Sequence, residues 1–418
     1  MSDHADPRNR RRIVVTGIGA VSPFGPGVDA LWEGLAAGEE RIRPVELFST
    51  EGHRTRLAAE VPELPESLPA GLVLPRGSRP SRTDRFALHA AHEAWLMAGL
   101  PLPAPPEAGL FLGSSTGGMY EGEEAYWRLR RTGPERARTK PFAPQPNGTP
   151  ADAVAHAFGL SGPVEALATA CAASTMALEA ALDSLRAGEV RVALAGGADG
   201  LCQTTFGGFN SLRAVDEAPA RPFRADREGL SLGEGAGFLV LETEADAASR
   251  GARPLAVLAG AGSTCDAFHM TAPCPEGSGA ARAMRVALAD AGVSPGAVGF
   301  LHAHGSGTPH NDQAEAAAIR AVFGERAATL PVTSSKGAVG HTLGSCGSLE
   351  AVITVLCLIH GRVHPTPGGG VVDPEARVDL VLGDPRAIDD ARPALSLNLA
   401  FGGANAALIL RKGPEDPR

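Results

Sequence analysis

The sequence predicts an α/β fold, and two observations lead to that expectation. Short apolar segments of strand length alternate along the chain with Ala- and Leu-rich segments of helical character, an order typical of layered α/β proteins. The chain has 418 residues, of which 44% are hydrophobic and 20% charged, an ordinary composition for a globular protein with a large core. We therefore expect sheets covered by helices rather than an all-helical or all-β protein.

The expected strands are short apolar runs, several of which end in Gly or Ser, where a chain turns. In chain order they are RRIVVTGIG, AGLFLGSS, EVRVALAGGADG, GAGFLVLET, LAVLAGAGST, VGFLHAHGSG, LPVTSSK and LSLNLAFGGANAALIL. Helices are expected over residues 82–99, 173–187 and 279–291. In the last of these, Ala281, Met284 and Leu288 follow helical spacing.

A short internal similarity hints at two related halves. The segments LSLGEGAGFLVLE (230–242) and LSLNLAFGGANAALIL (395–410) both lead through a Gly-rich turn into a strand, although a match this short is weak support for a repeat. Between the regular segments, residues 120–150 are polar and rich in Pro and Gly. We expect them to form an excursion over the surface, of the kind that shapes substrate access or a subunit contact.

Composition excludes several classes of protein. The basic N-terminal stretch MSDHADPRNRRR lacks the apolar run of a secretory signal, and we expect no segment near the ~20 residues needed to span a membrane. The six cysteines show neither a close C-x-x-C pair nor zinc-site spacing. The net charge of −9 argues against nucleic-acid binding. A soluble cytoplasmic protein without metal is expected.

The stretch ALATACAAST places Cys171 among small residues at the start of an Ala-rich helix. The helix dipole and the unpaired N–H groups there favour a thiolate, which makes the residue a candidate nucleophile. Free cysteines are also among the most buried residue types, so a small core residue is an equal alternative. The segment alone does not decide between them.

Two histidine-containing segments are the next candidates. In FLHAHGSGTPHND, His304 follows a strand, where α/β folds place their ligands, but His302 shares its face and periodicity does not choose between them. The segment SSKGAVGHTLGSCGSLE contributes the polar candidates Lys336, His341 and Glu350. A cysteine with two imidazoles is a set that polarises a carbonyl and stabilises an enolate or oxyanion.

A Gly-rich turn near the C-terminus is a further candidate. Phe401, Gly402 and Gly403 form a turn in LSLNLAFGGANAAL whose backbone N–H groups are able to face a ligand. A plain turn between two strands explains the same residues.

Taken in order, these segments resemble the β-ketoacyl-acyl carrier protein synthases, the elongating condensing enzymes of type II fatty acid and polyketide synthesis in the thiolase-like superfamily. The motifs that carry the resemblance span nearly the whole chain: RRIVVTGIGAVSPFG, TACAAST, AGGAD, RPFRADREGLSLGEGAG, HAHGSGTPHND, SSKGAVGHTLGSCGSLE and FGGAN. The resemblance implies a five-layered αβαβα fold made of two similar halves. The expected divisions are a flexible basic N-terminus (1–12), an N-terminal half (13–259), a C-terminal half (260–412) and a tail (413–418).

The resemblance also implies a reaction, the decarboxylative Claisen condensation of malonyl-carrier protein with an acyl chain held on Cys171. His304 and His341 would assist decarboxylation and stabilise the enolate. Lys336 and Glu350 would form a supporting ion pair. The oxyanion would be held by the backbone N–H groups of Cys171 and Leu399. No cofactor is implied beyond the phosphopantetheine that carries the substrates.

Substrate contacts follow from the same resemblance. It assigns an acyl pocket to Thr116, Phe209, Leu399 and Phe401, and phosphopantetheine contacts to Thr271, Ser306 and Thr308. Because acyl carrier proteins are acidic, a local basic patch must overcome the net negative charge of this chain. The candidates for that docking patch are Arg79, Arg82, Arg130, Arg131 and Arg213.

The departures from the family pattern concern substrate choice. Where elongating members commonly have NSFGFGG, this chain has LNLAFGG, with Leu399 at the gatekeeper position and Ala400 in place of Gly. We therefore expect a type II polyketide or polyene pathway. The alternatives are housekeeping fatty acid elongation, a thiolase or starter-type acyltransferase that uses coenzyme A, and a non-catalytic chain-length-type partner subunit. The expected partners are acyl carrier protein and a second subunit, in a homodimer or a heterodimer with a chain-length factor.

Overall fold

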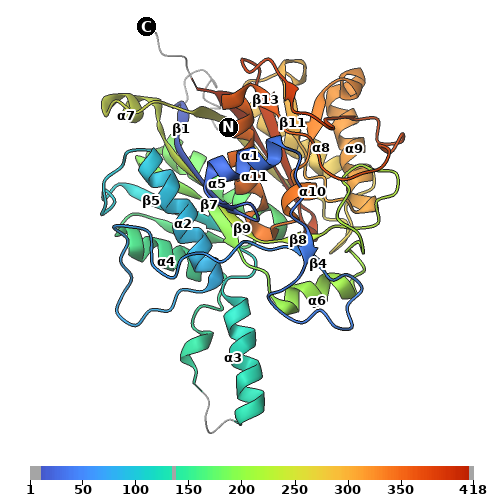
Figure 1. Cartoon of the computed structure of the whole chain (residues 1–418). Helices are drawn as coiled ribbons and strands as arrows, with labels where there is room; N and C mark the ends of the chain where they lie inside the picture. The colour runs from blue at the N-terminus through green and yellow to red at the C-terminus, as the bar shows by residue number, and fades with distance from the viewer. Residues whose placement is uncertain (1–10, 134–137, 414–418) are drawn as a thin grey trace.

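The computed structural model of the protein describes residues 11–133 and 138–413 (Figure 1). Most of the expected N-terminal segment 1–12 and of the tail 413–418 therefore lies outside the described residues. The main sheet has the strand order β14-β12-β11-β16-β17-β10-β1-β9-β7-β5-β6. It divides between β10 and β1 into two halves with the same internal order.

The N-terminal half of the sheet runs β1-β9-β7-β5-β6, and the C-terminal half runs β10-β17-β16-β11-β12. In both halves the first three strands are antiparallel and the last two join in parallel. A register shift recurs at the same place, between Val15 and Gly17 in one half and between Leu258 and Gly260 in the other. The expected fold of two similar halves is confirmed, and the two similar sequence segments supply the equivalent strands β9 and β17.

The strands of the N-terminal half are β1 (Ile13–Ser22), β5 (Ala108–Gly113), β6 (Val164–Leu167), β7 (Val192–Asp199) and β9 (Gly235–Thr243). Those of the C-terminal half are β10 (Ala256–Cys265), β11 (Phe300–His302), β12 (Pro331–Thr333), β14 (Asp379–Leu380), β16 (Ala394–Leu399) and β17 (Ala404–Lys412). The short pairings outside this order are β2 (Gly25–Pro26), β3 (Arg43–Pro44), β4 (Leu57–Ala59), β8 (Leu232–Gly233), β13 (Arg362–Val363) and β15 (Arg386–Ala387).

Helices form the layers around the sheet (Figure 1). Helix α5 packs on β7 and β5, and α11 packs on β9 and β16, so the two helices lie together at the centre. Helix α2 covers β1 and β9 from outside, and α8 covers β10 and β17. The helices are α1 (Val28–Ala36), α2 (Arg82–Met97), α3 (Met119–Thr132), α4 (Thr149–Phe158), α5 (Ala173–Ala187), α6 (Gln203–Ser211), α7 (Glu244–Ser249), α8 (Ser278–Asp290), α9 (Pro309–Phe323), α10 (Lys336–Val339) and α11 (Cys346–His360).

Helix α2 shows how local sequence and packing agree. Its first turn is closed by a capping box, in which the Asp84 backbone N–H donates to the Ser81 hydroxyl at 3.0 Å and the Ser81 N–H donates to Asp84 at 2.8 Å. The helix lies against glycines of β1, where a Cβ at Gly17 or Gly19 would come within 2.0 Å of a helix carbonyl oxygen. These glycines therefore set the close approach of α2 to the sheet.

Two expectations need correction. The segment 120–150 is not mainly an irregular excursion, because α3 occupies Met119–Thr132 and projects from the body of the protein (Figure 1). The sequence does not predict this helix, because most of its residues are polar or exposed and few are buried, so no apolar stripe at helical spacing marks it. The division expected after residue 259 falls inside β10, which pairs along its full length with β17 and, over residues 256–258, with β1.

Among the described residues, the segment that contains the central helix α11 is long and apolar enough to cross a membrane by length and composition. The 18 residues Leu343–His360 have a mean hydropathy of 1.6, which comes closer to membrane-spanning length and composition than expected. In the structure 89% of this segment is buried inside the protein. It is apolar all round because other elements cover it on every side.

Candidate active site

The site is built around Cys171, which lies in a sharp turn before helix α5. The chain leaves β6, passes through the 3₁₀ turn Ala170–Ala172 and enters the helix at Ala173. Ala170 has φ of +49°, a left-handed conformation that is costly for a residue with a side chain. This turn places Cys171 in the wall of a pocket of about 230 Å³, with 6% of its surface exposed.

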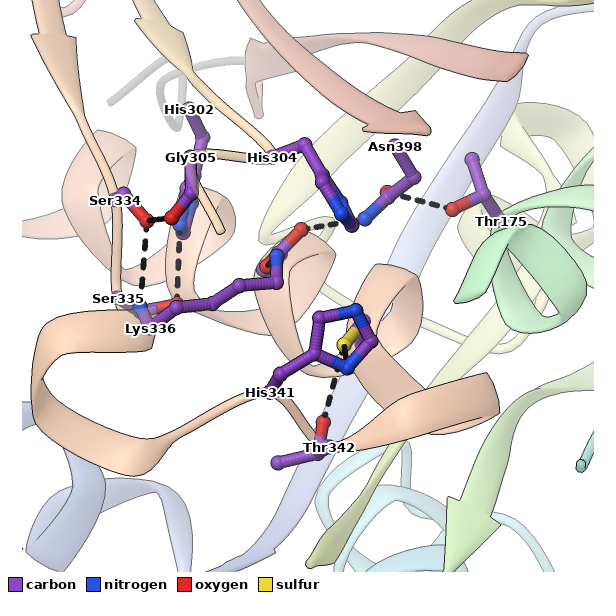
Figure 2. A network of polar contacts seen from close by, with 12 residues as sticks. Thr175, His302, His304, Gly305, Ser334, Ser335, Lys336, His341, Thr342 and Asn398 are labelled. Carbon is purple, nitrogen blue, oxygen red and sulfur yellow. Dashed lines mark hydrogen bonds and ion pairs between the residues drawn. The ribbon is translucent and has the colours of Figure 1, made fainter. Parts of the chain in front are cut away.

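His304 and His341 line the same pocket as Cys171. His304 follows strand β11, and His341 is fixed by backbone bonds, its N–H donating to Ser231 at 2.8 Å and its carbonyl accepting from Gly233 at 2.9 Å. The two imidazole rings lie edge to face, with centroids 5.3 Å apart (Figure 2). Three candidate residues from distant parts of the sequence therefore converge on one cavity.

The hydrogen bonds and burial of these imidazoles indicate how they carry protons. The backbone N–H of Leu343 donates to His341 Nδ1 at 3.1 Å, so Nδ1 is an acceptor and Nε2 carries the proton of the neutral ring. Burial lowers the pKa of His304 well below its ordinary value, and the nearby Lys336 ammonium and His341 lower it further. His304 is therefore neutral at neutral pH.

Lys336 and Glu350 form a buried ion pair. Figure 2 shows Lys336 beside His304 and His341. Burial by itself lowers the pKa of Lys336, but the adjacent Glu350 carboxylate outweighs it and raises that pKa above its ordinary value. Lys336 therefore stays charged. A buried pair of this kind leaves an uncompensated charge if one partner is removed.

The structure separates the two histidines that periodicity left equivalent. The His302 ring contacts the hydroxyls of Thr354 and Ser335 at 3.3 and 3.2 Å, and packs edge to face on His364 with centroids 5.5 Å apart. Figure 2 shows it beside Ser334 and Ser335, away from His341. His302 is thus a core residue with hydrogen-bond partners, while His304 faces the pocket.

Most of the expected substrate-contact residues line this pocket. The rings of Phe209 and Phe401 stack on each other with centroids 5.5 Å apart, next to His341. The hydroxyls of Ser306 and Thr308 lie 2.9 Å from each other. The pocket brings together Phe209, Thr271, Ser306, Thr308, Leu399 and Phe401.

Thr116 is placed differently from the expected acyl-pocket residue. Both its backbone N–H and its hydroxyl donate to Asp199 Oδ1 at 2.8 Å. The described residues that line the 230 Å³ pocket do not include it. Its polar group is thus used within the protein, and the sequence does not reveal this because Asp199 belongs to another strand.

The backbone N–H of Leu399 points away from the neighbouring strand β17. In an antiparallel pair, opposite residues alternate between those that exchange hydrogen bonds and those that do not. Ala400 N–H donates to the carbonyl of Ala404 at 2.8 Å, so the preceding residue, Leu399, points its N–H away from β17. Leu399 also lines the pocket that contains Cys171.

Three buried polar residues of the site were not singled out from the sequence: Asp199, Glu315 and Asn398. Glu315 accepts the backbone N–H groups of His304 and Gly305 at 2.7 and 2.8 Å, and burial raises its pKa to about 8. Asn398 donates to Glu350 at 2.7 Å. The AGGAD segment marked Asp199 only through resemblance, and no local pattern marks the other two.

The five candidate docking arginines do not lie together. Arg213 is exposed and lines the mouth of the active-site pocket. Arg79 lines a different cavity of about 790 Å³ beside α3, and Arg130 and Arg131 are exposed on the last turn of that helix. Arg82 forms an ion pair within the protein instead: its guanidinium binds the buried Glu234 carboxylate, with Nε 2.9 Å from Oε2.

Within residues 11–133 and 138–413, no group of three or more His, Cys, Asp or Glu is arranged to hold a metal ion. The hydroxyl groups of Thr271, Ser306 and Thr308 add polar groups to the lining of this pocket. The arrangement suits acyl transfer to a thiol with donors for a developing negative charge.

Comparisons with known proteins agree with this chemistry. Residues 10–247 match the family "Beta-ketoacyl synthase, N-terminal domain" and residues 255–369 match "Beta-ketoacyl synthase, C-terminal domain". The chain is 36% identical over 413 residues to 3-oxoacyl-[acyl-carrier-protein] synthase 2 of Staphylococcus aureus (strain COL), covering 96% of this chain and 98% of the relative.

Two solved structures are similar over almost the whole chain. The ishigamide ketosynthase/chain length factor matches with a TM-score of 0.91 and 35% identity, covering 96% of this chain and 99% of that chain. A type II PKS acyl-carrier protein in complex with its ketosynthase bound to the hexaketide matches with a TM-score of 0.88 and 30% identity, covering 97% and 100%. The family resemblance expected from the motifs is confirmed: the chain belongs to the beta-ketoacyl synthases and is an acyltransferase of the 3-oxoacyl-acyl-carrier-protein synthase type.

Proposed function

We propose that this enzyme condenses malonyl-carrier protein with an acyl chain held on Cys171, in a type II polyketide or polyene pathway. The observation that carries the proposal is the convergence of Cys171, His304 and His341 on one pocket. Each residue then has a separate part in the reaction.

In the first half-reaction the Cys171 thiolate attacks the thioester carbonyl of an acyl-carrier. A bond forms between Cys171 Sγ and the acyl carbon, the bond to the phosphopantetheine sulfur breaks, and the carrier sulfur leaves as a thiolate that takes up a proton from solvent. The N–H groups of Cys171 and Leu399 are the proposed donors to the oxyanion, since Leu399 N–H points away from β17. The start of α5 adds the positive end of a helix dipole.

In the second half-reaction malonyl-carrier occupies the pocket. Its bond to the carboxylate carbon breaks, carbon dioxide leaves, and the electron pair becomes an enolate. His341 Nε2–H and the neutral His304 are placed to donate to the enolate oxygen. The enolate carbon then attacks the acyl carbonyl, a carbon–carbon bond forms, and Cys171 Sγ leaves as the thiolate.

The choice of pathway rests on the pocket and on the structural relatives. Leu399 replaces the usual Phe at the gatekeeper position, and Ala400 replaces Gly beside it. The relatives with solved structures include proteins described as a ketosynthase/chain length factor and as a type II PKS ketosynthase bound to a hexaketide. The curated relative, a 3-oxoacyl-[acyl-carrier-protein] synthase 2, favours the second candidate, fatty acid elongation.

A panel of acyl carriers tests both parts of the proposal. The purified protein is incubated with saturated medium-chain, polyunsaturated and β-ketoacyl carriers, and the mass of the Cys171 adduct is measured for each. We expect faster acylation and condensation with the unsaturated or β-keto chains. Equal turnover of all three would reject the polyketide or polyene pathway, and absence of any Cys171 adduct would reject the enzyme in favour of a non-catalytic partner subunit.

A second subunit is part of the proposal, as a homodimer or a heterodimer with a chain-length factor. Strand β6 ends the sheet with exposed residues, and Val164 shows 40% of its surface. Tyr126 and Trp127 on the projecting α3 are also exposed. Apolar residues on an unpaired edge and on a projecting helix favour a partner. Mass measurement of the intact complex, alone and after coexpression with candidate chain-length factors, distinguishes the two assemblies.

Carrier docking is proposed at Arg213, with Arg79, Arg130 and Arg131 as a second group on and beside α3. Arg82 keeps an internal role. We expect Arg213→Glu to raise KM for acyl-carrier several-fold with little change in kcat, because a rim charge mainly steers encounter. Arg253→Glu, an exposed arginine outside both pockets, is the control. Equal KM values for the two variants would reject docking at Arg213.

A further inference from the structure

A chain of buried hydrogen bonds links the ion pair of the site to α5, the helix that follows Cys171 (Figure 2). One carboxylate oxygen of Glu350, Oε1, accepts a hydrogen bond from the Lys336 ammonium group. The other carboxylate oxygen of Glu350, Oε2, accepts a hydrogen bond from the Asn398 side-chain amide at 2.7 Å. The side-chain oxygen of Asn398, Oδ1, accepts a hydrogen bond from the Thr175 hydroxyl at 2.7 Å. Thr175 lies in the first turn of α5, just after Cys171.

Three elements meet at the Asn398 side chain. Asn398 itself belongs to β16, next to Leu399, while Glu350 lies on α11 and Thr175 on α5. Asn398 and Thr175 have no exposed surface. The two central helices are so close here that a Cβ on Gly347 would lie 1.8 Å from the Thr175 hydroxyl. Because every polar atom of the bridge is buried, loss of one bond leaves an unsatisfied group.

Asn398 is also a point where this chain departs from the family pattern. When NSFGFGG is placed over LNLAFGG, the serine falls on Asn398. A serine side chain is too short to span both Glu350 and Thr175 in the same way. The bridge is therefore a property of this chain's own residues.

We propose that Asn398 is a positioning residue for the condensation: it holds the Glu350 carboxylate toward Lys336 and fixes α5, the helix that follows Cys171, to the strand that contains Leu399. The inference rests on the proposed roles of Cys171 and Leu399. Asn398 is not among the described residues that line the pocket, so it acts through Glu350 and Thr175.

The charges around this bridge set the expected pH dependence. Glu350 faces Lys336 and the imidazole of His341, and Lys336 also faces Glu315 and the Cys346 thiol. Burial raises the pKa of Glu350, whereas the N–H donated by Asn398 opposes that rise. Without this donor the pKa of Glu350 rises further, and the loss of activity on the acid side begins at a higher pH.

The test uses two changes at Asn398. We expect Asn398→Ser to lower kcat about tenfold with little change in KM, because a hydrogen bond to a charged group is lost. Asn398→Asp keeps the size of the side chain but places a second carboxyl against Glu350, so the acid limb of its pH–rate profile should move furthest. Asn210→Ser is the control, since Asn210 is also a buried asparagine, with 8% of its surface exposed, and its side chain bonds to the backbone of Phe206 and Thr55 instead.

The other end of the bridge has its own matched pair. Thr175→Val removes the hydroxyl and should lower kcat about threefold, while Thr175→Ser should restore it. Ser184→Ala removes a buried hydroxyl that donates to Glu189 at 2.8 Å from the far end of the same helix, and should leave kcat and the pH profile unchanged. In the double variant with Asn398→Ser and Thr175→Val, the fold-reduction in kcat should be smaller than the product of the two single-variant reductions, because both changes break the same bridge.

The outcomes separate this inference from the proposed function. If the protein forms the Cys171 adduct and condenses, but Asn398→Asp and Asn398→Ser retain the wild-type pH profile and kcat, the positioning role is rejected. The positioning role is also rejected if the Asn398 variants lower the thermal stability but leave the kinetics of the folded enzyme unchanged. If the wild-type protein forms no adduct, the proposed function itself fails, whatever the Asn398 variants do.

Discussion

The two halves of the protein share a backbone plan but use it for different chemistry. Each central helix follows a 3₁₀ turn whose first residue has a positive φ without being glycine, Ala170 at +49° before α5 and Leu343 at +56° before α11. In the N-terminal half the next residue is Cys171, which faces the pocket. In the C-terminal half it is Gly344, where a Cβ would lie 2.7 Å from an Asp199 oxygen.

The turns after β5 and β11 form a second equivalent pair. A buried carboxylate holds the backbone of each: Asp199 accepts Ser115 and Thr116 N–H at 2.9 and 2.8 Å, and Glu315 accepts His304 and Gly305 N–H. The turn after β11 directs His304 into the pocket, whereas the turn after β5 directs Thr116 back to Asp199. The repeated backbone therefore provides equivalent positions, and the side chains decide which of them does chemistry.

The largest effect should come from the turn that presents the nucleophile. Cys171→Ala removes the acyl-accepting sulfur, so we expect no covalent adduct and a loss of condensation of ~10³-fold or more. Intact-protein mass spectrometry and product formation measure the two losses. Carbon dioxide release from malonyl-carrier should continue, because His304 and His341 remain. Undiminished condensation in this variant would remove the distinction between the halves.

The second prediction removes a histidine that the C-terminal half contributes to the pocket. His304→Gln should slow decarboxylation ~10²-fold or more while Cys171 is still acylated, since only the enolate loses its donor. His156→Gln, on α4, is the control. Because the pKa of His304 is lowered well below 6.5, the ring stays neutral as pH falls from 8 to 6.5, and the decarboxylation rate should hold over that range. An acid limb near pH 6.5 that vanishes in His304→Gln would contradict this assignment.

Asp199 links the turn after β5 to the turn before α11, and its substitution should mainly lower stability. It accepts Ser115 and Thr116 from one half and Gly344 N–H, at 2.6 Å, from the other. Asp199→Asn turns an amide N–H₂ toward these donors, which should lower the free energy of unfolding by about 1–3 kcal/mol in chemical denaturation. The exposed Asp226→Asn, paired with Arg221 at 2.7 Å, should cost less than about 1 kcal/mol. Similar losses in the two variants would show that Asp199 has no special linking role.

The smallest effect concerns selectivity at the gatekeeper. Leu399→Phe restores the residue of the family pattern and narrows the pocket that both halves share. A change of this size should shift the ratio of kcat/KM between unsaturated and saturated medium-chain acyl carriers about three- to tenfold toward the saturated chain. Leu397→Phe is not a suitable control because Leu397 is buried in the core, so Leu399→Met, which conserves volume, serves instead. An unchanged ratio in Leu399→Phe would mean that another residue sets acyl choice.

Much of the fold could be anticipated because its cues are local. The helices expected at 82–99, 173–187 and 279–291 occur as Arg82–Met97, Ala173–Ala187 and Ser278–Asp290. All the expected strand segments contain strands of the main sheet. Helix α3 was missed because its helical spacing lies in a polar arm.

The site could be anticipated only in part, since its members interact across long sequence separations. The positions Cys171, His304, His341, Lys336 and Glu350 came from ordered motifs, and the structure brings the first three around one pocket and pairs the last two. Arg82 binds a buried carboxylate, Glu234, that lies more than a hundred residues away in the sequence. The Asn398 bridge depends on Thr175, which lies on a separate helix. No periodicity carries that information.

By itself, the sequence determined the order of strands and helices and the residue types available for acyl transfer, because both follow from local apolar patterns and short motifs. The choice between His302 and His304, the turning of Thr116 toward Asp199, and the link from Glu350 through Asn398 to Thr175 were decided only by the tertiary structure. The physical reason is that a side chain's direction at the end of a strand depends on the turn that follows. Its partners, in turn, depend on which distant elements the sheet places beside it.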